Sequence, residues 1–191
     1  MIILILLACL TCSVRCSVRS SLPNHIAEHE AAGTYITYID NEQGDQQGDQ
    51  QGDQQGDDEQ GEQGEQGDQQ EDQQGYDIFV RKYPCTSPPP CRTLLFIHGF
   101  PTSSLDYVGV APSFTSTHTV VTYDHLGFGL SSKPPSVAYT MRLQAHILGF
   151  VMRTAAPPGG PGADVVAHDM GDTVLTEYLR LLSSGEISGG G

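Results

Sequence analysis

Apolar residues recur along the chain in patterns that predict five strands. Residues 33–39 alternate Tyr and Thr with Ile, and residues 76–81 form a second short strand beside them. Three later runs are almost continuously apolar, which is typical of strands buried on both faces of a parallel sheet. These runs are 92–98, 118–124 and 163–168.

Two segments carry apolar residues at helical spacing. Thr140 stands before one of them as a candidate N-cap, and residues 172–182 form the other. Apolar positions of the first recur on one face: Met141, Ile147, Leu148, Val151 and Met152. Two edge strands followed by alternating strands and helices predict an α/β fold, with a mostly parallel sheet flanked by helices.

Residues 42–75 interrupt this pattern with 12 acidic residues, 14 Gln and 8 Gly. The segment has no apolar side chain whose burial could offset its ordering entropy, so we expect a disordered insertion in a surface loop. A tract that binds a partner or cations is the alternative. Without these 12 charges the net charge of −14 falls to −2, which leaves no basic footprint for nucleic acid.

The N-terminus predicts entry into the secretory pathway. Its apolar run, residues 1–10, is shorter than the ~20 residues that a membrane-spanning helix needs. We therefore expect a signal peptide over residues 1–20, a location in the endoplasmic reticulum lumen or outside the cell, and membrane association through this segment alone. Cleavage leaves Cys85 and Cys91, in a Pro-rich loop, as a disulfide candidate; two free thiols are the alternative.

The segment that carries most chemical information is A-H-D-M-G-D at residues 167–172. A β-branched run enters a turn of small residues and a helical pattern leaves it, as in a nucleophile elbow. Asp169 stands at the tip, where a carboxylate suits attack on carbon to give an alkyl-enzyme ester. A helix N-cap is the alternative role for this residue.

Two further motifs precede the elbow: H-G-F-P-T-S-S at 98–104 and D-H-L-G-F-G-L-S at 124–131. In this order the three resemble the α/β-hydrolase fold, more narrowly its epoxide hydrolase and haloalkane dehalogenase branch. They are most similar to the mesoderm-specific transcript family. The resemblance covers residues 33–182, with 42–75 as an interruption, and implies the N-terminal portion of a hydrolase domain. Residues 183–191 are expected to form a flexible tail.

The resemblance implies roles for individual residues. Asp169 takes the nucleophile position, and the backbone N–H groups of Phe100 and Met170 form an oxyanion hole. It also implies a small-molecule substrate in a full-length form, with no cofactor and no metal. The remaining motif residues are expected to shape the turns: His98, Gly99, Pro101, Gly127, Gly129, His168 and Gly171.

The sequence also limits the chemistry. Dehalogenases of this branch hold the halide with an Asn after His-Gly and a Trp after the nucleophile, where this chain has Phe100 and Met170. The family's acid and His follow the nucleophile, whereas all 7 histidines here precede Asp169. We therefore expect an inactive truncated hydrolase; a non-catalytic secretory protein is the alternative. His25 and His29 are expected in a solvated segment and not at zinc.

Overall fold

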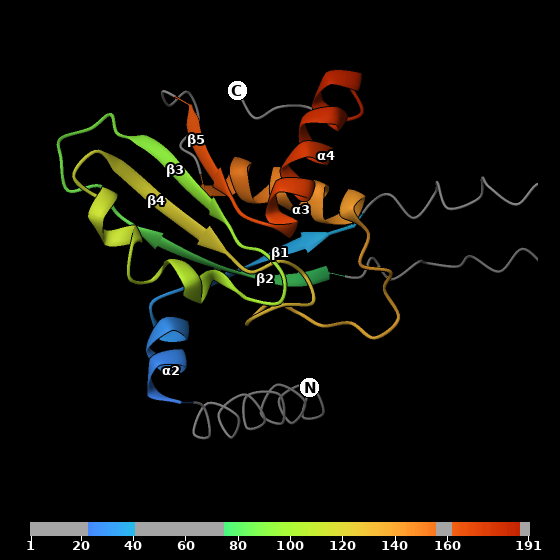
Figure 1. The fold of residues 1–191 in the computed structure, drawn as a ribbon, viewed down its shortest axis with the longest axis horizontal. Coiled ribbons are helices and arrows are strands. Elements are labelled where there is room, and N and C mark those ends of the chain that lie inside the picture. Colours follow the sequence, from blue (N-terminus) through green and yellow to red (C-terminus); the bar gives the residue numbers. More distant parts are fainter. Residues whose placement is uncertain (1–22, 41–74, 156–161, 188–191) are drawn as a thin grey trace, which may run out of the picture.

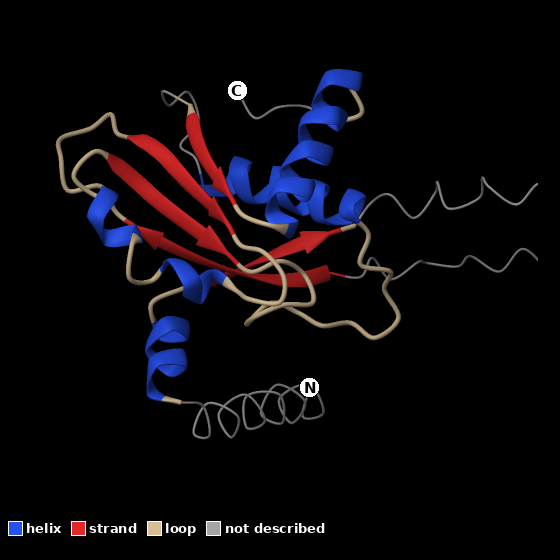
Figure 2. Ribbon diagram, in the orientation of Figure 1, coloured by secondary structure: helices blue, strands red, loops and turns tan. Residues whose placement is uncertain are grey.

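The computed structural model describes residues 23–40, 75–155 and 162–187. They form one five-stranded sheet with the strand order β1-β2-β4-β3-β5 (Figures 1 and 2). The strands are β1 (Thr34–Ile39), β2 (Gly75–Tyr83), β3 (Arg92–Ile97), β4 (His118–Tyr123) and β5 (Ala163–Ala167). Every predicted strand is present, with ends that differ from the prediction by at most two residues.

The sheet is mixed. β3 pairs in parallel with both β4 and β5, whereas β2 pairs antiparallel with β1 and β4. The parallel pairs place the carboxyl ends of β3, β4 and β5 at one edge, where loops that follow different strands can meet. All three sequence motifs begin at these carboxyl ends.

Alternating side chains of β3 build two apolar layers, one on each face of the sheet. Leu95 and Ile97 belong to the larger cluster, and Leu94 and Phe96 belong to the smaller one. Because successive strand residues point to opposite faces, a continuously apolar strand needs cover on both sides. The continuous apolar run over residues 92–98 therefore indicates a strand that is covered on both faces.

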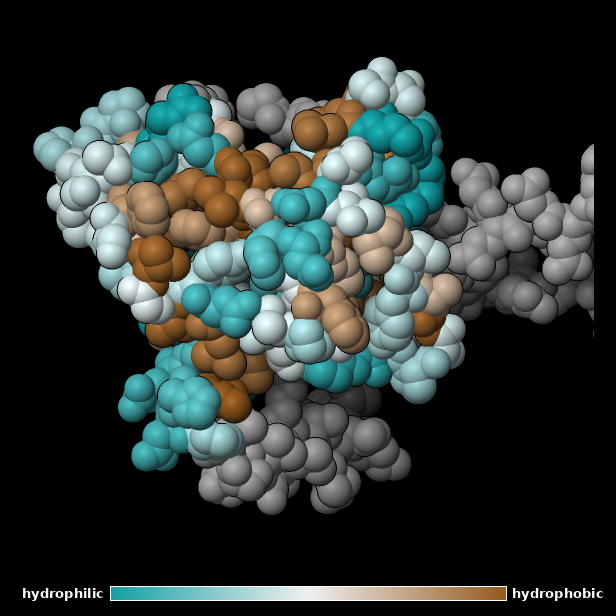
Figure 3. All heavy atoms as spheres, viewed as in Figure 1, coloured by the Kyte–Doolittle hydropathy of each residue, from teal (hydrophilic) through white to brown (hydrophobic). Residues whose placement is uncertain are grey.

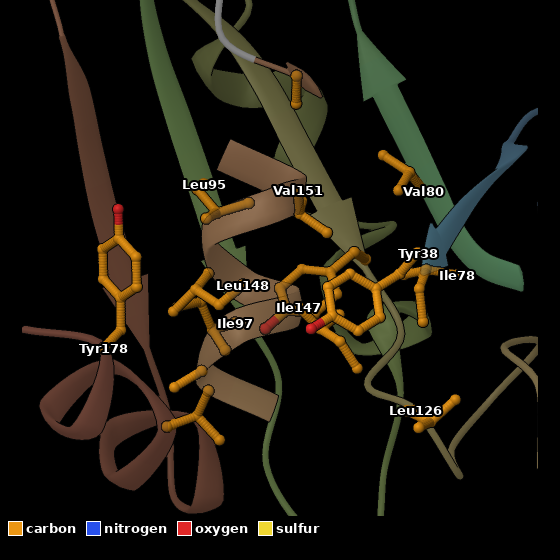
Figure 4. Packing of buried hydrophobic residues seen from close by; sticks show 14 of the residues in the cluster. Tyr38, Ile78, Val80, Leu95, Ile97, Leu126, Ile147, Leu148, Val151 and Tyr178 are labelled. Carbon is orange, nitrogen blue, oxygen red and sulfur yellow. The ribbon is translucent and has the colours of Figure 1, made fainter. Parts of the chain in front are cut away.

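Two helices cover the larger layer: α3 (Met141–Ala155) and α4 (Met170–Ser184). Thr140 caps α3 as predicted, since its Oγ1 accepts from the Leu143 N–H at 3.1 Å. Gly185 ends α4 in the left-handed conformation, with φ 77°. Figure 4 shows the side chains that meet between these helices and the sheet: Tyr38, Ile78, Val80, Leu95, Ile97, Leu126, Ile147, Leu148, Val151 and Tyr178.

The opposite face carries two short 3-10 helices, η1 (Ser104–Tyr107) and η2 (Ala111–Phe114). Tyr107 stacks on Phe96 with ring centroids 4.7 Å apart, and its hydroxyl donates to the Ile97 carbonyl at 2.9 Å. This face is therefore covered by a thin layer of loop and turns.

A further helix, α2 (Asn24–Ala31), precedes β1 and corrects the expectation of a solvated segment. His25 is exposed, but His29 is only 2% exposed and bonds to Ser104 Oγ at 2.9 Å. A single buried polar side chain, that of His29, attaches this helix to the domain. The helix has no broad apolar face. That is why apolar periodicity did not reveal it.

Two predicted boundaries shift. Gly75, placed at the end of the insertion, begins β2, and α4 continues through Ser184, so the expected tail begins later. Glu186 beyond the helix pairs with Arg142 at 2.7 Å. The predicted signal peptide and nearly all of the predicted insertion lie outside the described residues.

β5 forms an edge of the described sheet, paired only with β3 there. Val166 on this strand is 44% exposed and Leu179 on α4 is 54% exposed. Figure 3 shows apolar surface gathered over the region where β3, β4 and β5 lie in Figure 1. Among the described residues, no helix has the length and apolar character needed to cross a membrane.

Candidate active site

Asp169 stands at the turn between β5 and α4, as the elbow pattern predicts. Its backbone has φ 55° and ψ −120°, and no other described residue except glycine has a positive φ. Such backbone conformations are unfavourable for a side chain and persist where the surroundings impose them, often at functional sites. The strained turn exposes the carboxylate at the carboxyl edge of the sheet.

One oxygen of Asp169 accepts two backbone hydrogen bonds. The Phe100 N–H donates to Oδ1 at 2.9 Å, and the Met170 N–H donates to the same atom at 2.6 Å. The bond from Phe100, and then that from Met170, holds the Asp169 pKa below its usual value. The carboxylate is therefore ionised at neutral pH, and Oδ2 takes no part in either bond.

The hydrogen bond from the Met170 N–H also makes Asp169 the N-cap of α4. This contact is therefore expected both for a helix cap and for a nucleophile, and does not distinguish the two roles. A cap alone, however, would involve only the helix that Asp169 begins. The Phe100 N–H comes from a loop 69 positions away in the sequence. Two backbone N–H groups from separate elements thus converge on one carboxylate oxygen.

Two glycines allow the elements to approach this closely. A Cβ on Gly99 would lie 2.5 Å from the Asp169 Cβ, and one on Gly171 would lie 2.7 Å from the Ile97 carbonyl oxygen. Larger residues would push the Phe100 loop away from Asp169, or α4 away from the end of β3. The Phe100–Pro101 peptide bond in this loop is cis.

Beneath the loop, His98 and His125 are both fully buried and pack with ring centroids 4.4 Å apart. The His125 N–H donates to His98 Nε2 at 3.0 Å, and His125 Nε2 lies 3.1 Å from the His98 carbonyl. Burial lowers the pKa of both rings, that of His125 to about 3. Both rings are therefore neutral, and the contacts of His98 in the described structure are hydrogen bonds within the site's own loops.

The loop after β4 is organised by Asp124, which is 1% exposed. Its carboxylate accepts from the Ser104 N–H and from the Leu130 N–H, each at 2.7 Å. Gly129 adopts φ 47°, and a Cβ there would lie 2.1 Å from Asp124 Oδ2. Gly127, at φ 90°, packs against Tyr139. Both glycines have a positive φ, which a residue with a side chain rarely adopts.

Other predicted residues lie around or away from this centre. His168 is exposed beside Gly99, with its N–H bonded to the Ile97 carbonyl at 3.1 Å. Cys85 and Cys91 form a disulfide in the loop before β3, at the opposite end of the strand from Phe100. Within the described ranges, no group of three or more His, Cys, Asp or Glu side chains could hold a metal ion.

Ser104 and His29 form a buried pair that is not a second nucleophilic site. The Arg81 guanidinium, a donor only, lies 2.9 Å from His29 Nδ1, so this nitrogen accepts. In the neutral ring Nε2 then carries the hydrogen and donates to Ser104 Oγ, so it cannot remove the hydroxyl proton. Ser104 is also fully buried. The pair therefore anchors α2 to the domain.

Sequence reasoning did not single out His125, Asp124 and Gln144 as supports of the site. Gln144 on α3 accepts from the Leu126 N–H at 3.2 Å and donates to the Leu126 carbonyl at 2.8 Å. Gln144 could have been noticed in the sequence as a polar residue on the apolar face of a predicted helix. Such a residue needs a buried partner, but the sequence does not say which.

Comparison with known proteins identifies the fold. Residues 92–184 match the family described as the α/β hydrolase fold. A crystal structure described as that of a hydrolytic enzyme from Pseudomonas aeruginosa superimposes with a TM-score of 0.55 at 17% identity, over 80% of this chain and 38% of that one. This chain has the α/β-hydrolase fold. The fold expected from the three motifs is thereby confirmed.

Curated relatives agree with this α/β-hydrolase assignment. A Mycobacterium tuberculosis protein named as a hydrolase, LipZ, is 44% identical over 103 residues, which are 53% of this chain and 33% of that protein. The bovine mesoderm-specific transcript homolog protein is 38% identical over 87 residues, 45% of this chain and 26% of that protein. The resemblance to the mesoderm-specific transcript family is thus confirmed, and the chain spans about a third or less of the relatives' length.

Proposed function

We propose that Asp169 is the nucleophile of a hydrolase that acts on a small-molecule epoxide through an alkyl–aspartyl ester. The observation that carries this proposal is that the two oxygens of the Asp169 carboxylate have different surroundings. Oδ1 is held by the N–H groups of Phe100 and Met170, whereas Oδ2 faces no such donor. The low pKa of Asp169 keeps the group in its nucleophilic, ionised form.

In the first step, Oδ2 attacks a ring carbon of the epoxide. A new carbon–oxygen bond forms, the carbon–oxygen bond of the ring breaks, and the released alkoxide takes a proton from solvent or from a donor supplied elsewhere in a longer protein. The Asp169 carboxylate becomes an ester whose carbonyl oxygen is Oδ1. That oxygen already lies in the hole, so the two N–H donors need not move before the next step.

In the second step, water attacks the ester carbonyl carbon and gives up a proton to a base. Negative charge then develops on Oδ1, where the donors from Phe100 and Met170 stabilise it. Collapse breaks the bond between Oδ2 and the former carboxyl carbon, which releases a diol and restores the carboxylate. We assign the base that accepts this proton to no described residue.

The same positions argue against a halide as leaving group. Phe100 and Met170 offer backbone donors to Asp169 but no side-chain N–H with which to hold a departing halide. When an epoxide ring opens, its oxygen stays in the product as an alkoxide. The reaction therefore needs a proton for that oxygen and no site for a departing halide. This difference favours epoxides over alkyl halides as the substrate class.

The test is covalent labelling of the folded chain with styrene oxide, followed by intact mass measurement and peptide mapping. We expect one adduct per molecule on Asp169. Hydroxylamine should remove it, because it cleaves esters but not alkylated amines or thioethers. Asp169→Asn should abolish the label while keeping the shape of the side chain.

Asp172→Asn is the matched control, because Asp172 is an exposed acid in the first turn of the same helix. It should be labelled like the unaltered chain. Equal labelling of Asp169→Asn, or a hydroxylamine-resistant adduct, would overturn the proposal.

A further inference from the structure

The geometry points to His125 as a positioning residue for the candidate active site: together with His98 it forms a reciprocal clasp that holds the Phe100 N–H on Asp169. This inference rests on the proposed function, because it explains how the donor loop is kept in place. His125 touches neither Asp169 nor the space beside Oδ2. It acts through His98 and the loop that His98 begins.

Each histidine holds the other through both ring and backbone. The backbone N–H of His125 bonds to the His98 ring at 3.0 Å, and the His125 ring bonds to the His98 carbonyl at 3.1 Å. His98 Nδ1 also lies 2.9 Å from the Gly99 carbonyl, whose peptide unit leads into Phe100. The position of the Phe100 N–H is therefore tied to the turn after β4.

The partners dictate where the protons lie. His98 Nε2 accepts from a backbone N–H, so Nδ1 carries the hydrogen and donates to the Gly99 carbonyl. His125 Nε2 donates to a carbonyl, so its Nδ1 accepts, and the Tyr123 hydroxyl lies 3.3 Å away. Each neutral ring thus uses both of its nitrogens, and protonation of either would remove an acceptor.

The clasp is braced from both sides. Phe128 packs edge-on against the rings of His98 and His125, with centroid distances of 5.7 and 6.2 Å, and lies 6.2 Å from the Phe100 ring. On the other side, Gln144 of α3 binds both backbone groups of Leu126, the residue after His125. A movement of the β4 loop would therefore displace Phe100.

The electrostatic surroundings keep the pair neutral. Burial disfavours the charged form of both rings, and each would repel the other if both were protonated. The hydrogen bond with the Gly99 carbonyl, and then Asp124 and Asp106, act in the opposite direction on His98, and the hydrogen bond with the His98 carbonyl does so on His125. Burial is the larger effect, so the clasp persists through the physiological pH range.

The test measures the pKa of Asp169 by carbon-13 NMR of its carboxylate in the full 191-residue chain. The Phe100 N–H is the larger cause of the low pKa, so its loss should raise that pKa. We expect His125→Phe, which keeps a ring but removes both polar atoms, to raise the Asp169 pKa toward its ordinary value, because the carboxylate loses the N–H donor that lowers it most. His125→Gln, whose amide N–H can still donate to the His98 carbonyl, should restore most of the lowering.

His146→Phe is the control, because His146 is a buried histidine on α3 outside the clasp. It should change thermal stability without moving the Asp169 pKa. An unchanged Asp169 pKa in His125→Phe, or an equal rise in His146→Phe, would overturn the clasp. An ordinary Asp169 pKa in the unaltered chain would instead overturn the hole and with it the proposed function.

Nitrogen-15 NMR of the unaltered protein provides a second measurement if a variant does not fold. The clasp requires hydrogen on Nδ1 of His98 and on Nε2 of His125. The opposite tautomer at either ring would contradict it.

Discussion

At the residue scale, the candidate site depends on the absence of a side chain at position 99. The strand end that carries Gly99 and the elbow that carries Asp169 touch through backbone and Cβ atoms. A methyl group at position 99 would lie 2.5 Å from the Asp169 Cβ and 2.9 Å from the His168 carbonyl oxygen. Neither neighbour is a flexible side-chain end that could move aside.

We therefore predict that Gly99→Ala lowers the free energy of unfolding by about 1–3 kcal/mol, the usual cost of overpacking, and abolishes labelling of Asp169 by styrene oxide. Gly109→Ala is the control, because a Cβ there would meet nothing within 4 Å. Chemical denaturation and mass measurement check both effects. Normal labelling of Gly99→Ala would show that the loop can shift without losing the site.

His29 provides a second prediction at this scale. Burial lowers its pKa; Asp124 acts in the opposite direction and Arg81 in the same direction. The ring packs on Phe79 with centroids 5.0 Å apart. Because the folded pKa lies below the unfolded value, the folded state disfavours the proton. The contribution of His29 to stability is complete above about pH 6.5 and declines as the pH falls below it.

We expect amide protons of α2 to lose their exchange protection at acid pH before those of the sheet. In His29→Gln this pH dependence should disappear. His25→Gln, an exposed histidine of the same helix, should behave like the unaltered chain. Hydrogen exchange measured by mass spectrometry distinguishes these outcomes, and equal pH dependence in all three proteins would contradict the assignment to His29.

At the scale of elements, β1 and β2 form an antiparallel pair whose register brings Ile39 opposite Gly75. The residues that flank segment 41–74 are thus already neighbours in the sheet. Residues Thr34 to Ile39 pair without interruption with the first part of β2. The hairpin therefore needs only a short connection.

We predict that replacing residues 41–74 by a two-residue Asn-Gly turn keeps the fold and raises the free energy of unfolding by up to about 2 kcal/mol, because a shorter loop costs less closure entropy. Circular dichroism and chemical denaturation check this. Loss of the folded state would mean that the segment has a structural part in the domain.

The elements that the sequence predicts well are those whose signal is local. β3 and β4 appear as continuous apolar runs because each is covered on both faces, and the small residues around Asp169 mark a turn that needs no distant partner. The predicted α3 begins at Thr140 because its cap is also local. α2 gave no such signal, since only His29 among its eight residues is buried.

The supports of the site could not be predicted for a related reason. Phe100 and Asp169 follow from motifs, but the His98–His125 clasp depends on which strands become neighbours. The parallel pairing of Ile97 with Tyr123 places the two histidines side by side. The spacing of residues in the sequence does not show which strands are neighbours. A buried histidine could therefore be recognised from the sequence, but its partner could not.

At the scale of the whole molecule, the described histidines differ in whether their rings are available to act as a base beside Asp169. His29, His98 and His125 are buried and use their ring nitrogens in structural hydrogen bonds. His118 lies at the opposite end of the sheet, paired with Asp164 at 3.1 Å. His168 is the imidazole beside Asp169 in the sequence.

We predict that styrene oxide alkylates Asp169 once and that the ester then persists, because its hydrolysis needs a base-activated water and the buried histidines hold their ring nitrogens in other hydrogen bonds. Diol formation and protein mass, followed together, check this. Repeated turnover that His168→Ala abolishes would identify His168 as the missing base and contradict the prediction.

We also propose that the chain enters the secretory pathway, where the Cys85–Cys91 disulfide would be stable. Mass measurement of protein from the lumen or the medium should find a mature N-terminus near Leu22. A cytosolic protein that retains Met1 would contradict this proposal.

From the strand order β1-β2-β4-β3-β5 we expect a particular order of strand pairing during synthesis. As the chain leaves the ribosome, β1 and β2 can pair at once, but β3 has no neighbour until β4 has emerged and entered between them. β5 then adds to the free side of β3. The Phe100 N–H therefore meets its acceptor only after 69 further positions have been translated. Asp169 therefore reaches the Phe100 loop only after the four strands that precede it have been made, and a nascent chain that stalls earlier exposes the apolar edge of β3 to aggregation.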